Sequence, residues 1–126
     1  MARKKLPAAN DWQNREIDDW NATTFRAYFG HKHHERFGIP YEPFGNWGME
    51  SAKYKQAYEQ YGKATVRRFI DEQIAAYKPT KTYPGTSFGY LFTYYKRELQ
   101  QAAASIRKEA ERAEMVTDTN TEEWEW

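Results

Sequence analysis

Residues 54–77, YKQAYEQYGKATVRRFIDEQIAAY, decide the fold of this chain. Before Gly62, apolar side chains recur every three or four residues: Tyr54, Ala57, Tyr58 and Tyr61. After it the same spacing returns at Val66, Phe69, Ile70, Ile74 and Tyr77. That spacing places side chains on one face of a helix, and glycine commonly ends a helix. The stretch predicts two amphipathic helices, at about 49–61 and 63–78, the second closed by Pro79.

Similar patterns on either side predict two further helices. The first, at about 22–37, has Asn21 as its cap and Gly38 as its stop. The last, at about 87–114, begins at Thr86 or Ser87 and carries a long apolar stripe: Phe88, Leu91, Phe92, Tyr95, Leu99, Ala102, Ala103 and Ile106. Residues 38–48 read as a loop whose large side chains, Tyr41, Phe44 and Trp47, pack across a helix pair. No segment predicts a strand.

The composition predicts an aromatic interior. The 126 residues include 10 Leu, Ile and Val but 22 Phe, Tyr and Trp. Each buried ring removes roughly 150–250 Å² from water, so few aliphatic residues are needed. We therefore expect an all-α, compact four-helix domain at 20–114, with a loose, flexible basic N-terminal arm at 1–19 and a flexible acidic tail at 115–126. Many of the ten tyrosines should lie at the edge of the core.

Several classes of site and location are disfavoured. The absence of Cys excludes disulfides and thiolate chemistry and suits a reducing compartment, so we expect a cytoplasmic protein. No apolar run is long enough to span a bilayer. The N-terminal charges precede no apolar stretch, so they do not form a secretory signal.

Catalytic patterns are also lacking. His31, His34 and Glu35 share a helix face, but their spacing is not that of a metalloprotease helix, and no further His exists outside this cluster. We read them as an exposed polar face and predict no metal and no cofactor. No serine lies in a nucleophile elbow. Residues 83–87 precede a helix and could offer N–H groups to a phosphate, but we favour the simpler explanation that they are an ordinary helix start. The chain is predicted not to be an enzyme.

The charges are strongly segregated along the chain. Net charge is +3 over residues 1–15, −3 over 16–50, +6 over 51–97 and −5 over 98–126. In the basic middle, cations alternate with tyrosines, as nucleic-acid binding requires. The predicted phosphate-binding residues are Lys63, Arg67, Arg68, Lys78, Lys81, Lys96 and Arg97. The alternative is that the rings rim the core while the cations are solvated.

The acidic C-terminal segment ends in Trp124-Glu125-Trp126. Exposed indoles reduce solubility unless they bind something, so Trp124 and Trp126 are predicted to dock on a protein partner. In style the segment resembles the acidic terminal peptide of single-strand-binding proteins. Docking on the basic middle of the same chain, autoinhibition by charge and plain disorder remain alternatives.

Residues 49–97 resemble a helical module of small bacteriophage and mobile-element proteins. The resemblance rests on Tyr61-Gly62, Ile70-Asp71 and a Pro-containing turn followed by Ser87-Phe88-Gly89. It implies an accessory role in DNA replication or transcription. The leading hypothesis is therefore a non-enzymatic phage-type accessory protein that contacts nucleic acid through its basic face and a protein through its tail. The alternative is an adaptor or inhibitor of a host enzyme without nucleic-acid contact.

Overall fold

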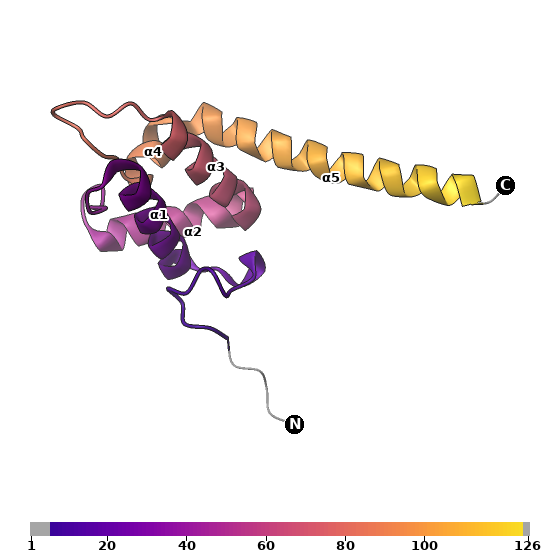
Figure 1. Ribbon diagram of the computed structural model, residues 1–126, viewed down its shortest axis with the longest axis horizontal. Coiled ribbons are helices and arrows are strands. Elements are labelled where there is room, and N and C mark those ends of the chain that lie inside the picture. Colours follow the sequence, from indigo (N-terminus) through magenta and orange to yellow (C-terminus); the bar gives the residue numbers. More distant parts are fainter. Residues whose placement is uncertain (1–5, 125–126) are drawn as a thin grey trace, which may run out of the picture.

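The computed structural model describes the backbone of residues 6–124 and the side chains of residues 6–115. Over this range the chain forms five α-helices and no strand: α1 (Ala22–Phe37), α2 (Trp47–Tyr61), α3 (Lys63–Ala76), α4 (Phe88–Tyr94) and α5 (Lys96–Trp124). A short 3-10 helix, η1 (Ile17–Asp19), precedes them. Helices α1–α4 and the start of α5 form a compact body, from which the rest of α5 projects (Figure 1). No helix in the described range has the length and apolarity needed to cross a membrane.

Local sequence signals fix most helix ends. Asn21 caps α1 through a reciprocal pair of hydrogen bonds with Thr24, and Gly38 ends it in the left-handed conformation, as predicted. Gly62 separates α2 from α3 with φ of 91°, which few other residues adopt at low cost. Asn46 accepts a hydrogen bond from the Met49 amide, so α2 begins at residue 47 rather than 49.

The predicted fourth helix is in fact two helices, so the four-helix expectation was wrong. Tyr95, at φ −121° and ψ 41°, interrupts the helix between α4 and α5. The Thr93 hydroxyl donates to the Gly89 carbonyl at 2.7 Å, and this back-bond to the preceding turn favours bending. Helix α5 then continues to Trp124, beyond the predicted end near residue 114 and through most of the predicted tail.

The core is built mainly of rings, as the composition predicted. The almost fully buried side chains include Trp20, Phe25, Phe29, Phe69 and Phe88. Phe88 stacks on Tyr54 with ring centroids 4.2 Å apart and meets Phe69 edge-on at 6.2 Å. Offset-stacked and edge-on pairs of this kind add to the free energy gained by burying the rings.

The segment before α1, predicted as a loose arm, contacts the helices from Trp12 onward. The Trp12 ring meets Tyr28 edge-on at 4.9 Å. Arg15 donates to the Pro7 and Asp19 carbonyls, and the Trp20 indole N–H donates to the Arg15 carbonyl. Trp20 itself is part of the core, so this segment reaches the helical body well before α1 begins.

Candidate ligand-binding groove

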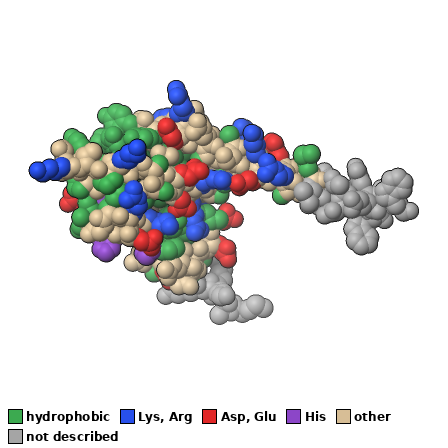
Figure 2. Space-filling model, turned by 45° about the horizontal axis from the view of Figure 1, so that its top comes forward, with side chains coloured by type: hydrophobic (Ala, Val, Ile, Leu, Met, Phe, Trp, Pro, Cys, Tyr) green, Lys and Arg blue, Asp and Glu red, His purple; other side chains and the backbone are tan. Residues whose placement is uncertain are grey.

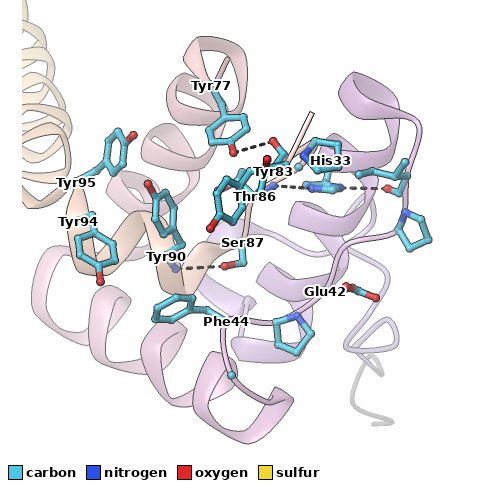
Figure 3. A pocket seen from close by; sticks show the side chains of 17 residues that line it. His33, Glu42, Phe44, Tyr77, Tyr83, Thr86, Ser87, Tyr90, Tyr94 and Tyr95 are labelled. Atoms are coloured by element: carbon cyan, nitrogen blue, oxygen red, sulfur yellow. Dashed lines mark hydrogen bonds between the residues drawn. The ribbon is translucent and has the colours of Figure 1, made fainter. Parts of the chain in front are cut away.

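A groove of about 950 Å³ lies where three segments meet: the loop after α1, the loop between α3 and α4, and the end of α4 (Figure 3). Six aromatic side chains line it: Phe44, Tyr77, Tyr83, Tyr90, Tyr94 and Tyr95. The lining also includes prolines from both loops. Glu42 is the one carboxylate among the lining residues. The groove is therefore aromatic, with little negative charge of its own.

Three of these rings stand unusually far out of the surface. Tyr83 is 67% exposed, Tyr94 65% and Phe44 37%, among the described side chains. Tyr90 contacts Tyr94 with centroids 5.1 Å apart, and Phe44 approaches Tyr94 edge-on at 6.4 Å. Clustered exposed rings commonly mark a binding surface rather than a solvated one.

Two further tyrosines, Tyr77 and Tyr90, line the groove. The Tyr77 hydroxyl donates to the Tyr83 carbonyl at 3.2 Å, so it ties the loop between α3 and α4 to the end of α3. Partial burial raises the pKa of both Tyr77 and Tyr90 above the ordinary value. Both hydroxyls are therefore protonated at neutral pH and can donate hydrogen bonds.

Behind the groove lies Glu50, a fully buried carboxylate. It accepts backbone N–H bonds from Phe44 at 3.2 Å, Phe88 at 3.1 Å and Gly89 at 2.9 Å, and a hydrogen bond from the Tyr41 hydroxyl. One side chain of α2 thus joins the loop after α1 to the first turn of α4. Buried charge is tolerated only where it is well paired, and here every donor comes from an element that lines or supports the groove.

Glu50 also determines whether residues 83–87 can form the phosphate site considered from the sequence. The first two N–H groups of α4 donate to its carboxylate, and the third donates to Ser87 Oγ at 3.3 Å. The protein's own anion occupies the position that a phosphate would take. The segment is therefore a helix start and not an anion site.

In the polar cluster around Glu50, the hydroxyls of Tyr41 and Tyr54 are both protonated. The Tyr41 and Tyr54 hydroxyls lie 2.8 Å apart. Burial, together with the neighbouring Glu50 carboxylate, raises the pKa of both far above the ordinary tyrosine value. Tyr54 has no exposed surface, which makes it an exception to the expectation of tyrosines at the core edge.

His33 connects the two loops of the groove. It is buried on α1, where Nδ1 lies 3.2 Å from the Ile39 carbonyl and Nε2 accepts from the Thr86 amide at 3.1 Å. Since Thr86 N–H can only donate, Nε2 is unprotonated and Nδ1 carries the hydrogen. Burial lowers the pKa of His33. A Cβ on Gly85 would lie only 2.5 Å from this ring, so the loop passes close enough to require glycine there.

The predicted basic residues fall into two groups. Lys78 and Lys81 are exposed on the loop between α3 and α4, which also carries the groove residue Tyr83. Lys96 directly follows Tyr95, another groove residue, and its ammonium lies 3.2 Å from the centre of the Phe92 ring. Exposed Arg97 comes next in the chain. These four cations are within two residues of lining residues along the chain, although none of them lines the groove itself.

The other three sites, all on α3, are engaged elsewhere. Lys63 donates to the Asp18 carbonyl at 2.7 Å. The Arg67 guanidinium lies over the rings of Trp20 and Tyr28, at 5.0 and 5.1 Å. Arg68 pairs with Glu72 on its own helix and with Glu109 on α5. These residues hold α3 against neighbouring elements and are not brought to the groove. The positive charges seen in Figure 2 are spread over the surface among acidic side chains.

The cations near the groove, like Lys63 and Arg67 on α3, form no ion pair with a described side chain. Among the described side chains, no ion pair within 4.0 Å involves Lys53, Lys78, Lys81 or Lys96. Burial and the nearby Lys53 together lower the pKa of Lys96. Two neighbouring ammonium groups that are not neutralised by an ion pair attract an anion.

The histidine cluster forms no metal centre within the described range, where no group of three His, Cys, Asp or Glu side chains comes together. His31 and Glu35 lie 3.3 Å apart on the exposed face of α1, while His33 is committed to the groove loops. The side chains of Trp124 and Trp126, predicted to bind a partner, lie outside those the structure describes.

Sequence reasoning missed Glu50 and the division of tyrosines between core and groove. A signal for Glu50 exists, because it precedes Tyr54 by four residues and therefore continues the apolar stripe of α2. A carboxylate on such a stripe indicates a buried anion with specific donors. Periodicity places Tyr54 on an apolar stripe and leaves Tyr83 and Tyr94 off any stripe, but it does not show that these two rings meet in a groove.

No known family, curated protein or solved structure matches this chain.

Proposed function

We propose that this protein is a non-enzymatic accessory protein that binds single-stranded nucleic acid in the aromatic groove. The proposal is carried by the exposed rings of Tyr83, Tyr94 and Phe44, beside lysines that form no ion pair with any described side chain. Unstacked bases bind such rings regardless of sequence, while lysines contact the phosphates between them. In a duplex the bases already stack on one another, so the rings favour single strands.

The proposal changes the set of basic residues that are expected to contact phosphates. Lys78, Lys81, Lys96 and Arg97 remain candidates because they are within two residues of lining residues along the chain, and Lys53 joins them because it lies near Lys96. Lys63, Arg67 and Arg68 are excluded from the proposed site, since their contacts are internal. A binding role rather than catalysis is supported by two of the polar side chains that line the groove: both His33 nitrogens and the Ser87 hydroxyl are used to hold the chain itself. The resemblance to bacteriophage modules supports a place in DNA replication or transcription.

Fluorescence anisotropy with a labelled 20-nucleotide oligo(dT) and the corresponding duplex, at 50 and 200 mM salt, tests the proposal. Stacking on a ring is worth roughly 1–3 kcal/mol per base, so Tyr83→Ala/Tyr94→Ala should weaken single-strand binding at least tenfold. Lys78→Gln/Lys81→Gln should flatten the salt dependence, by about 0.7 in the logarithmic slope for each phosphate that a lysine no longer neutralises.

The matched control is Arg107→Gln/Lys108→Gln, which removes two exposed charges from α5 and should leave affinity nearly unchanged. Circular dichroism of each variant checks that the fold is intact. Failure of the unchanged protein to bind either oligonucleotide at 50 mM salt would contradict the proposal and favour the adaptor or inhibitor hypothesis.

A further inference from the structure

The sequence itself contains a segment whose chemistry matches that of the groove. Residues 117–126 contain four acidic residues, no basic residue and two tryptophans. The groove offers exposed rings for indoles, and the lysines beside it, which form no ion pair with any described side chain, suit carboxylates. Acidic aromatic segments dock on basic aromatic grooves by these two interactions together.

The position of α5 determines whether residues 117–126 can reach the groove of their own molecule or only that of another. Helix α5 starts directly after the groove residue Tyr95 and ends at Trp124. Its 29 residues span roughly 43 Å at 1.5 Å per residue. Figure 1 shows this end of α5 at the opposite extremity of the molecule from the loop between α3 and α4. Trp126, two residues further, gains at most about 7 Å.

A tryptophan carried on this helix therefore cannot return to its own groove. We infer that residues 117–126 of one molecule dock in the aromatic groove of a second copy of this chain. Such a contact joins two different surfaces and so repeats from molecule to molecule, producing head-to-tail chains or rings rather than only a symmetric dimer. The inference goes beyond the proposed function, since it requires no nucleic acid.

Sedimentation velocity of the full chain at 50 mM salt, without nucleic acid, tests the inference. The sedimentation coefficient should rise with protein concentration past that of a dimer and fall again at 500 mM salt, since charge pairs contribute. Trp124→Ala/Trp126→Ala removes the indoles, and Tyr83→Ala/Tyr94→Ala removes the exposed rings of the groove. Each double variant alone should associate at least tenfold more weakly than the unchanged chain.

Mixing the two double variants in equal amounts gives the decisive measurement. The groove variant still has a tail and the tail variant still has a groove, so together they should form one-to-one complexes and nothing larger. A full chain that stays monomeric, association that survives in both variants, or a mixture without complexes would overturn the inference. Nucleic-acid binding is measured separately, so failure here leaves the proposed function standing.

Discussion

Tyrosines are exposed on the groove surface, whereas in the polar cluster around Glu50 behind it they are held by hydrogen bonds. Tyr41 and Tyr54 have their hydroxyls in hydrogen bonds, and the Tyr54 ring is buried in the core while the Tyr41 ring packs, partly buried, against it. Tyr83 and Tyr94 are about two-thirds exposed. The buried pair stabilises the fold, whereas the exposed pair contributes little to it and is free for a ligand. The two regions are joined through Phe44, whose amide donates to Glu50 while its ring lines the groove.

Changes behind the groove should therefore alter the free energy of unfolding, while changes on the exposed rings should alter binding alone. Exposed substitutions usually shift stability by no more than about 0.5 kcal/mol. Tyr83→Ala/Tyr94→Ala is therefore the reference against which changes in the buried cluster are compared.

Glu50→Ala should have the largest effect on stability. It leaves the buried N–H groups of Phe88 and Gly89, and the part-buried Phe44 N–H and Tyr41 hydroxyl, without their acceptor. Each unsatisfied buried group costs about 1–3 kcal/mol, so the two buried amides alone should lose about 2–6 kcal/mol. Urea denaturation followed by circular dichroism measures it. Glu59→Ala, on the exposed face of the same helix, is the control, and a loss below about 1 kcal/mol for Glu50→Ala would show that the carboxylate does not hold these elements together.

Gly89→Ala should cause the next largest loss of stability. A Cβ at this position would lie 2.5 Å from Glu50 Oε1 and 2.8 Å from Phe44 Cβ, so α4 must move away from α2. Overpacking of this kind costs about 1–3 kcal/mol. Gly30→Ala is the matched control within α1, since the nearest atom outside its own helix would be 3.7 Å away and alanine favours helix by up to about 1 kcal/mol. Equal effects of the two changes in urea denaturation would contradict this account.

The contrast also shows what sequence can and cannot predict here. The bounds of α1 and the junction at Gly62 were predicted because caps and stops are local. The break at Tyr95 was not, since one unbroken apolar stripe runs through it and periodicity does not reveal the Thr93 back-bond that favours the bend. Periodicity reports which face is buried, but not where a helix changes direction.

The groove was harder to predict than the helices. Its basic residues were recognised by type, yet only their contacts separate Lys81 beside the groove from Arg68 between two carboxylates. Its rings come from segments up to about fifty residues apart, so no spacing rule connects Phe44 with Tyr94. Such a site follows from the packing of the helices, which sequence periodicity alone does not fix.

The smallest predicted effect is a change of stability with pH that depends on His33. Above pH 6.5 the His33 ring is neutral in folded and unfolded chains, so its bonds to Ile39 and Thr86 contribute fully. Because burial lowers the pKa of His33 in the folded state, the unfolded chain binds the proton first as pH falls below 6.5. Stability should decline from there down to the folded pKa and then level. Urea midpoints between about pH 7.5 and 5 should show this decline in His34→Gln, whose ring is exposed, but a weaker one in His33→Gln. The same pH profile in both variants would mean that His33 is not the titrating link between the groove loops.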